Sequence, residues 1–216
     1  MAINKSSYCD IYRFDLENPI LTVGVIADTH IPDRARELHP LIIPTLIEAK
    51  VDLILHAGDI SGRGVLEELG KVAPVKAVRG NRDWLFLNTL PLVLKLELAN
   101  VPVVLMHGHG GYVNYLKDKF LFIRDGYQFL RYQKKLVKLA VESKVIVFGH
   151  THRSENVTID GRLWFNPGSA NLGYQGGILP SIGFLRFFDK GVVRGKILEL
   201  DGFQLREGVW EAKSVS

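Results

Sequence analysis

The sequence predicts an α/β fold with several parallel strands, and two observations lead to this prediction. Short apolar runs typical of buried strands alternate with segments whose apolar residues recur at helical spacing. Polar residues follow each of the first three strands directly, as expected where the carboxyl ends of parallel strands meet at one edge of a sheet. We expect one domain, residues 1–216, of which residues 1–20 form an N-terminal extension.

The first half of the chain alternates strands with helices. Leu21–Ala27 is a largely apolar strand, and residues 40–49 have the apolar spacing of a helix with proline near its first turn. Leu53–His56, Gly64–Leu69 and Val75–Val78 continue as strand, helix and strand. The polar segments after the three strands are Asp28-Thr29-His30, Gly58-Asp59 and Gly80-Asn81-Arg82.

The second half of the chain is richer in hairpins. Val93–Leu98 and Val101–Met106 flank an Ala-Asn turn, and an Asp-Gly turn separates the strand-like residues 156–159 and 162–165. Tyr112–Glu142 is predicted to be helical. Its apolar side comprises Phe129, Tyr132, Leu136 and Leu139. Further strands are predicted at Ile182–Phe188 and Val192–Leu200.

Composition and charge argue against several classes of protein. The longest apolar runs, such as Val101–Met106, fall far short of the roughly 20 residues that a membrane-spanning helix needs. Cys9 is the only cysteine, and residues 1–20 lack the apolar stretch of a signal peptide, so we expect a cytoplasmic protein without membrane association. The net charge of +4 is too small to indicate nucleic-acid binding, although seven basic residues lie between positions 117 and 138.

The polar segments contain side chains that are typical metal ligands. In Asp28-Thr29-His30, a carboxylate and an imidazole stand two residues apart, so an extended strand end can turn both to one side. Asp59 follows a glycine, and its two oxygens can bridge two cations. Asn81 offers a neutral carbonyl oxygen, and imidazoles follow two further strands. The predicted metal ligands are Asp28, His30, Asp59, Asn81, His107, His150 and His152.

This order of motifs resembles the calcineurin-like metallophosphoesterase superfamily over roughly residues 22–200. Asn166-Pro167-Gly168-Ser169 is similar to a motif of its small bacterial and archaeal phosphodiesterase branch. The resemblance implies a four-layer α/β/β/α sandwich with two divalent metal ions. It assigns the first ion to Asp28, His30, Asp59 and His152, and the second ion to Asp59, Asn81, His107 and His150.

The resemblance also implies a hydrolytic mechanism. Nitrogen and oxygen ligands without thiolate suit Mn²⁺, Fe, Co²⁺, Ni²⁺ or Zn²⁺, and we expect Mn²⁺ because it is a common activator in the family. A metal lowers the pKa of bound water to about 7, so a hydroxide that bridges two ions can attack phosphorus in line. The two cations then neutralise the developing negative charge. We expect a phosphodiesterase that acts on a small-molecule diester or a nucleotide.

Arg82 departs from the pattern of many phosphomonoesterases of the superfamily, which have a histidine there that helps to protonate the leaving oxygen. Arginine is a poor proton donor near neutral pH, but its N–H groups match a phosphate. We therefore expect Arg82 to bind substrate oxygens and activated diesters to be favoured over alkyl monoesters. His109 either approaches the phosphate from the rim of the site or faces solvent. The expected catalytic residues are Asp59, Asn81, Arg82 and His109, of which Arg82 and His109 would bind substrate.

Other polar residues have structural and functional interpretations. His56 would pack in the core or support the ligands, and His39, next to a proline, is expected at the surface. Asp83 would orient Arg82 or cap the following segment. We expect the Asn166-Pro-Gly-Ser turn to place a loop near the site.

Two alternatives to a small-molecule phosphodiesterase remain. A retromer subunit of the same fold is a protein-interaction scaffold, and residues 28–34 and 166–170 are similar to it. All seven ligand positions are filled here, which favours an enzyme. A nuclease would use the same two-metal chemistry, but the modest net charge argues against it.

Residues 111–143 are longer than expected for compact members of the family and form a helical insertion. This insertion would either cap the metals or present a solvated basic face. A more specific alternative is that the insertion binds nucleotides or RNA. The sequence is also compatible with a homo-oligomer.

Overall fold

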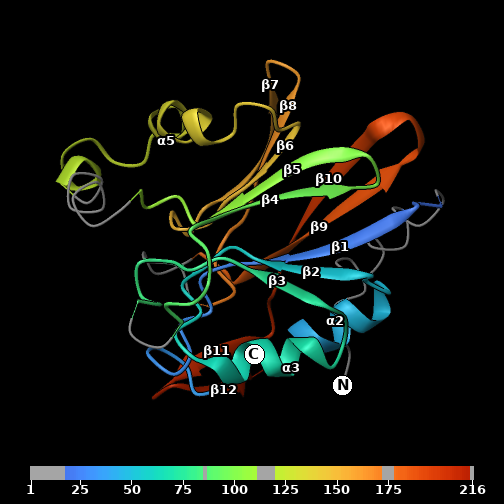
Figure 1. The fold of residues 1–216 in the computed structure, drawn as a ribbon. Helices are drawn as coiled ribbons and strands as arrows, with labels where there is room; N and C mark the ends of the chain where they lie inside the picture. The colour runs from blue at the N-terminus through green and yellow to red at the C-terminus, as the bar shows by residue number, and fades with distance from the viewer. Residues whose placement is uncertain (1–17, 85–86, 111–119, 172–177, 215–216) are drawn as a thin grey trace.

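Two five-stranded sheets form the centre of the structure, a computed structural model that describes residues 18–84, 87–110, 120–171 and 178–214 (Figure 1). The first sheet has the order β10-β9-β1-β2-β3 and comprises β1 (Leu21–Ile26), β2 (Leu53–His56), β3 (Val75–Ala77), β9 (Ser181–Phe188) and β10 (Val192–Glu199). The second has the order β4-β5-β6-β8-β7 and comprises β4 (Val93–Leu98), β5 (Val101–Met106), β6 (Val145–Val147), β7 (Ser154–Ile159) and β8 (Arg162–Pro167).

Parallel pairing determines where the polar segments lie. β1, β2 and β3 are parallel to one another, and so are β5, β6 and β8. Each of these two groups of strands therefore places its carboxyl ends at one edge of its sheet. The segments with Asp28, Asp59 and Asn81 follow the first group, and those with His107 and His150 follow the second.

The packing of the sheets gives four layers. Val23 and Val25 of β1 point into an apolar core that the two sheets share. On the opposite face of β1, a Cβ at Gly24 would lie 2.7 Å from the side chain of Leu46, so glycine allows helix α2 (Ile42–Glu48) to approach closely. Helix α3 (Arg63–Gly70) packs on the same face, and α5 (Phe129–Leu136) covers the outer face of the second sheet (Figure 1). The predicted α/β/β/α sandwich is confirmed.

The helical insertion is divided into short pieces. Residues 120–125 are helical, α5 follows, and a 3₁₀ turn, η1 (Val137–Leu139), ends the segment. Tyr132 and Leu136 are buried as predicted, but Leu139 is 44% exposed. Ala140, which follows η1, is fully buried instead, in the same apolar cluster as Leu136. Residues 111–119 of the insertion and 1–17 of the extension lie outside the described residues.

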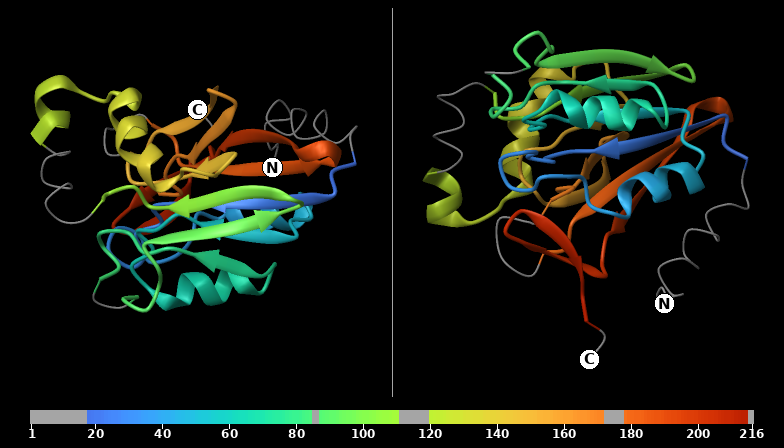
Figure 2. Two further views of the ribbon diagram at one scale, coloured as in Figure 1. Left: turned by 45° about the horizontal axis from the view of Figure 1, so that its top comes forward. Right: turned by 90° about the horizontal axis from the view of Figure 1, so that it is seen from below.

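A C-terminal hairpin was not predicted. It consists of β11 (Phe203–Arg206) and β12 (Val209–Ala212), joined through Glu207 and Gly208 with φ of 48° and 81°, as in a type I′ turn. The hairpin lies apart from both sheets, on the side of α2 and α3 (Figures 1 and 2). A short turn, η2 (Asp189–Gly191), joins β9 to β10 through Lys190 and Gly191, which have φ of 58° and 69°.

The hairpin covers His39, so the prediction of a surface position for this residue is wrong. His39 is 1% exposed, and its ring lies 5.4 Å from the ring of Phe203 and 4.5 Å from that of Trp210. Trp210 also donates a hydrogen bond to the carbonyl of Glu37 at 3.2 Å.

None of the helices among the described residues has the length and apolar character that a membrane crossing requires.

Candidate metal centre

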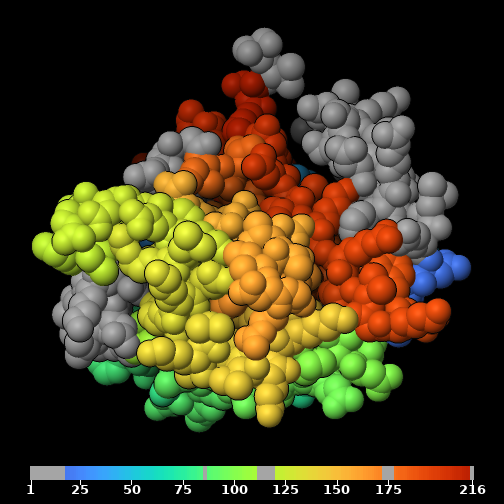
Figure 3. All heavy atoms as spheres, turned by 90° about the horizontal axis from the view of Figure 1, so that it is seen from above, coloured from blue at the N-terminus to red at the C-terminus, as the bar shows by residue number. Residues whose placement is uncertain are grey.

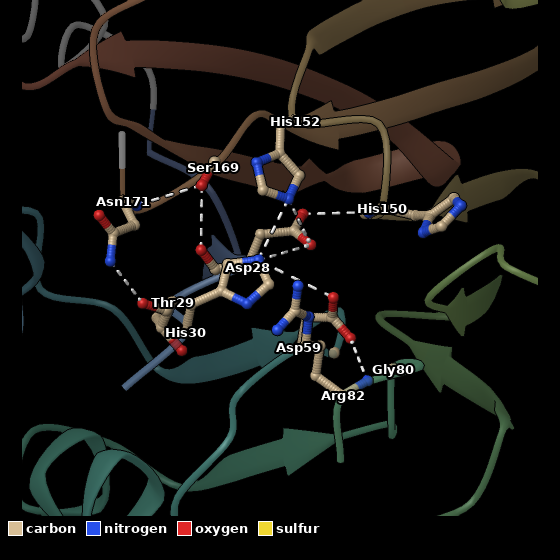
Figure 4. Close-up of polar contacts among 12 residues, drawn as sticks. Asp28, Thr29, His30, Asp59, Gly80, Arg82, His150, His152, Ser169 and Asn171 are labelled. Carbon is tan, nitrogen blue, oxygen red and sulfur yellow. Dashed lines mark hydrogen bonds and ion pairs between the residues drawn. The ribbon is translucent and has the colours of Figure 1, made fainter. Parts of the chain in front are cut away.

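The loops after β1, β2, β3, β5 and β6 meet at one site between the two sheets (Figure 4). All seven predicted ligands lie there. Asp28, His30, Asp59, His107 and His152 are buried, with at most 8% of the residue exposed, and Asn81 and His150 are half-buried. The site therefore combines residues that are up to 124 positions apart in the sequence, Asp28 and His152.

Five of the seven predicted ligands have a left-handed backbone. Their φ angles lie between 50° and 73°, at Asp28, His30, Asp59, His150 and His152. A non-glycine residue in this region costs about 1–2 kcal/mol, and such residues cluster at functional sites. The surrounding structure therefore holds these five residues in an unfavourable backbone conformation, which sets the orientation of their side chains.

The first group of ligand atoms comes from both sheets. Nε2 of His152 lies 3.4 Å from Oδ1 of Asp28 and 3.2 Å from Nε2 of His30. Nε2 of His30 is in turn 4.0 Å from Oδ1 of Asp28 and 3.8 Å from Oδ2 of Asp59. Metal–nitrogen bonds of about 2.0–2.1 Å would place two ligands of one ion about 3.0–3.4 Å apart. The two imidazole nitrogens thus have the spacing of ligands to a shared ion.

The second group of ligand atoms has similar spacing. Nε2 of His107 lies 3.2 Å from Oδ1 of Asn81 and 3.4 Å from Oδ1 of Asp59. Nδ1 of His150 lies 3.1 Å from the same oxygen of Asn81. Both groups offer only nitrogen and oxygen atoms, which suit divalent transition metals.

Asp59 connects the two groups because its oxygens face in different directions. Oδ2 faces His30, whereas Oδ1 faces His107 and accepts a hydrogen bond from the backbone N–H of Arg82 at 2.9 Å. The approach depends on Gly80, since a Cβ there would overlap the Asp59 carboxylate. The carboxylate is therefore positioned to bridge two cations.

The ionisation states of the buried groups in the centre favour the binding of a cation. Burial opposes the charged form of His107, but Asp59 and Asp28 outweigh burial and raise its pKa to about 9. Burial likewise opposes ionisation of Asp59, yet His107 and His30 hold the pKa of this carboxyl below its usual range. The buried carboxylates thus depend on a nearby positive charge, which a divalent ion would provide in place of the proton on His107.

One buried oxygen supports the same conclusion. Oδ1 of Asp28 accepts no hydrogen bond from any described residue, although Asp28 is fully buried. The oxygen faces Nε2 atoms of His30, His107 and His152 at 3.4–4.0 Å. A buried carboxylate oxygen without a hydrogen-bond donor is costly, and coordination of a metal would satisfy it. The residues present therefore fit a metal centre.

Asp83 connects two of the ligand loops, a role that differs from both roles considered for it in the sequence. The side chain is fully buried. Its Oδ1 accepts hydrogen bonds from the backbone N–H groups of Ile60 at 2.9 Å and Ser61 at 2.8 Å, and its Oδ2 accepts one from Gly80 at 2.6 Å. Burial raises the pKa of Asp83 although these bonds favour the carboxylate. Asp83 thus fixes the loop of Asp59 relative to that of Asn81.

The turn that begins at Asn166 supports two other ligand loops. Asn166 donates hydrogen bonds to the carbonyl of Gly149 at 3.1 Å and to Oγ1 of Thr151 at 3.0 Å, within the Gly-His-Thr-His segment. Ser169 donates to the carbonyl of Asp28 at 3.0 Å (Figure 4). Asn171 donates to the carbonyl of Thr29 at 2.9 Å.

His56 lies beneath the loop that carries Asp28 and His30. Its Nδ1 accepts a hydrogen bond from the N–H of Gly58 at 3.2 Å, which leaves Nε2 to donate to Oγ1 of Thr29 at 3.2 Å. Burial lowers the pKa of His56 to about 3, so the ring is neutral. His56 thus links the loops after β1 and β2.

The two predicted substrate residues lie at different depths. The guanidinium of Arg82 is 3.8 Å from Asp33, with both side chains well exposed, 46% and 39%. His109 is only 8% exposed, so it does not face open solvent, and its ring lies 5.4 Å from that of His107 and 6.3 Å from that of His150. Burial and the charge on His107 lower the pKa of His109 to about 4. A neutral imidazole therefore borders the second ligand group.

Comparisons with known proteins agree with this geometry. A probable metallophosphoesterase from Methanothermobacter thermautotrophicus is 34% identical over 149 residues, which cover 69% of this chain and 77% of that protein. A phosphodiesterase from Methanocaldococcus jannaschii is 24% identical over 181 residues, covering 76% and 92%.

The solved structure of vacuolar protein sorting 29 from Cryptosporidium parvum matches with a TM-score of 0.66 and 21% identity, covering 91% of this chain and 97% of that one. At this identity, the likeness bears on the fold alone. Residues 21–184 match the family model described as the calcineurin-like phosphoesterase superfamily domain. The chain belongs to the calcineurin-like phosphoesterase superfamily.

Proposed function

We propose that the chain is a metal-dependent phosphodiesterase with two divalent ions at this centre. The observation that carries the proposal is the position of Asp59, whose two oxygens face the two separate ligand groups. Two bound ions would supply Lewis acidity at the phosphate and lower the pKa of the attacking water. The first would be held by Asp28, His30, Asp59 and His152, and the second by Asp59, Asn81, His107 and His150.

Two residues outside the proposed ligand set would act on the substrate. Arg82 is anchored through its backbone to Asp59, while its guanidinium is exposed and can form a fork of N–H bonds with phosphate oxygens. His109 is neutral and buried beside His107, so one of its ring nitrogens can donate a hydrogen bond to a substrate oxygen. Both roles orient the phosphate.

The absence of a histidine after Asn81 predicts which phosphate esters the protein hydrolyses fastest. Arg82 stays protonated and cannot efficiently donate a proton to a leaving alkoxide, a step that contributes about 10²–10⁴-fold in rate. Turnover should therefore be faster for substrates with a good leaving group. We expect the Mn²⁺-loaded protein to hydrolyse bis(4-nitrophenyl) phosphate faster than 4-nitrophenyl phosphate, which has the same leaving group. Because both esters release 4-nitrophenolate, a preference for the monoester would contradict the predicted preference for diesters but would leave the proposed metal-dependent hydrolysis intact.

The proposed cofactor is Mn²⁺, with Fe, Co²⁺, Ni²⁺ and Zn²⁺ as alternatives of similar ligand preference. The proposed substrate is a small-molecule phosphodiester or a nucleotide. The M. jannaschii relative, which is named a phosphodiesterase, supports this class. The cytoplasmic location and a homo-oligomer remain predictions from the sequence.

A non-catalytic scaffold is the second candidate. The observation that favours it is the similarity of residues 28–34 and 166–170 to the retromer scaffold subunit of the same fold. All seven predicted ligand positions carry metal-binding side chains, and five of them have a strained backbone. An interaction surface requires neither feature, so the site favours an enzyme. Absence of diester turnover with every divalent metal tested would favour the scaffold, and turnover of oligonucleotides faster than of small diesters would favour a nuclease.

A further inference from the structure

A pocket lies between the loop after β1 and the first turns of α3, and the proposed hydrolysis has not assigned it a role. Its volume is about 340 Å³, within the size range of small-molecule sites. Ile31, Leu38 and Val65 line it with apolar side chains, and Leu38 and Val65 are only 6% and 3% exposed. We call this space the α3 pocket. It offers apolar surface to a ligand.

The α3 pocket adjoins the proposed substrate residue Arg82. Pro32, which lines the pocket, is followed in the chain by Asp33. Gly62, which also lines it, follows Ser61. Oδ2 of Asp33 accepts a hydrogen bond from Oγ of Ser61 at 3.0 Å and lies 3.8 Å from the guanidinium of Arg82. A phosphate ester held by Arg82 at the metal centre therefore has the α3 pocket as a neighbour on the side of Asp33.

Backbone contacts hold both walls of the α3 pocket. The inner wall depends on a close approach of two ligand loops, in which the N–H of Ile31 donates to the carbonyl of Ile60 at 3.1 Å. A Cβ at Gly62 would lie only 2.9 Å from the carbonyl oxygen of Ile31, so glycine permits this approach. The hairpin β11–β12 holds the outer wall, because the N–H of Arg36 donates to the carbonyl of Gly208 at 2.8 Å. The pocket is thus formed before a ligand binds.

The opposite side of the metal centre, toward the second sheet, is covered by α5. Leu136 is fully buried, and its side chain would lie only 3.6 Å from a Cβ at Gly108, next to His107. Tyr132 is 7% exposed, and its ring lies 6.3 Å from that of His150. Figure 3 looks down on this layer and shows the yellow segment of α5 beside the orange residues of β7 and β8. Among the described residues, space for a bulky ester group therefore lies on the side of α3.

The edge of the α3 pocket indicates which kind of group it accepts. Arg36, Glu37 and Glu68 line this edge and are exposed. Two carboxylates against one guanidinium disfavour a second phosphate at this place. The apolar floor of Ile31 and Val65 suits the face of an aromatic ring, whose burial is favourable. The lining therefore fits an uncharged aromatic group.

We propose that the α3 pocket binds the ester group that stays on phosphorus during hydrolysis, and that this group is aromatic. The inference rests on the proposed function and narrows the substrate class to phosphodiesters with an aromatic group on the ester oxygen that does not leave. Arg82 would hold the phosphate between the metal centre and the pocket. Water adds its oxygen to phosphorus, the alcohol on the opposite side leaves, and the product monoester keeps the aromatic group.

Binding tests this inference without turnover. The Mn²⁺-loaded protein would be titrated by calorimetry with ethylphosphonate and with benzylphosphonate. Both have a C–P bond in place of the ester bond, and they differ by a methyl group against a phenyl ring. We expect benzylphosphonate to bind at least about tenfold more tightly, because the ring becomes buried. Equal affinities in the wild type would overturn the proposal.

Two glycines of α3 provide a matched pair of variants. Gly64 lines the α3 pocket and Gly70 does not, and a Cβ at either would meet no atom within 4 Å. Neither glycine has a positive φ, so both positions accept a side chain. Gly64→Trp should occupy the pocket and remove most of the preference for benzylphosphonate, whereas Gly70→Trp should retain it. Thermal unfolding checks that both variants fold, and a preference that survives in Gly64→Trp would contradict the assignment of the pocket.

Kinetics separate this inference from the proposed function. Methyl 4-nitrophenyl phosphate and phenyl 4-nitrophenyl phosphate both release 4-nitrophenolate and differ in the group that stays on phosphorus. Gly64→Trp should raise KM about tenfold for the phenyl diester, with kcat changed less than about twofold and little effect on the methyl diester. Equal impairment of both substrates would contradict a role in recognising the aromatic group. If the wild type turns over neither diester, the proposed hydrolysis fails, and the binding experiment still decides the role of the α3 pocket.

Discussion

At the scale of single residues, the clearest sign of function is backbone strain at the proposed ligands. Asp28, His30, Asp59, His150 and His152 all have positive φ, a conformation that is uncommon for residues other than glycine, although asparagine, aspartate and histidine adopt it more often than other side chains. Residues in this conformation cost about 1–3 kcal/mol each and cluster at functional sites. Metal binding would offset this cost, because it stabilises only the folded chain.

The strain at His152 leads to a test of its role. We expect His152→Asn to lose most of the increase in Tm that Mn²⁺ gives the wild type, while the metal-free Tm stays equal or rises. Asparagine accepts the φ of 55° but lacks the imidazole that faces Asp28. The measurement is thermal unfolding with and without Mn²⁺. Lys50→Asn is the matched control, because Lys50 has a φ of 50° outside the centre. A full Mn²⁺ shift in His152→Asn would show that metal binding does not need the imidazole of His152.

Asp83 permits a second prediction at this scale. Alanine there would leave three buried backbone N–H groups without an acceptor, so we expect the free energy of unfolding to fall by about 3 kcal/mol or more. Affinity for Mn²⁺ should fall as well, because the loops of Asp59 and Asn81 lose their connection. Denaturant unfolding of the metal-free protein measures the first effect, with exposed Asp189→Ala as the control. Similar stability of the two variants would contradict the structural role of Asp83.

At the scale of elements, local patterns predicted much of the fold. Residues 93–98 and 101–106 form the predicted hairpin with the predicted bounds, since Ala99 and Asn100 have φ of 49° and 60° in its two-residue turn. The hairpin β11–β12 has a similar turn at Glu207-Gly208, a signal that the sequence offered and the prediction missed. Its contact with His39 could not be predicted locally, because it joins distant parts of the chain.

The contact between this hairpin and His39 predicts a dependence of stability on pH. Burial, with a smaller contribution from Lys213, lowers the pKa of His39 from 6.5 to about 4, although Asp201 opposes the shift. Between these pH values the unfolded chain binds more protons than the folded chain, so the free energy of unfolding should fall as the pH decreases from about 6.5 to 4. His39→Gln should lose this contribution. Unfolding of both proteins across this range measures the difference, and parallel curves would show that His39 does not titrate on unfolding.

At the scale of the whole molecule, the centre exists only because the two sheets meet. The order of ligand residues and the parallel strands were enough to predict which loops converge, since each loop follows a strand end. The supporting hydrogen bonds were not predictable in the same way. Asp83 bonds to Ile60 and Ser61, 23 and 22 positions away, and Ser169 bonds to Asp28, 141 positions away. Such pairings depend on tertiary packing and leave no local pattern.

The account depends most on two metal ions acting together through Asp59. The direct test is titration of the metal-stripped protein with Mn²⁺ while hydrolysis of bis(4-nitrophenyl) phosphate is measured. We expect negligible turnover without metal, a rate that reaches its plateau at two ions per chain, and no metal-dependent turnover in Asp59→Ala. A plateau at one ion per chain, substantial turnover in Asp59→Ala, or no turnover at any Mn²⁺ concentration would contradict the account.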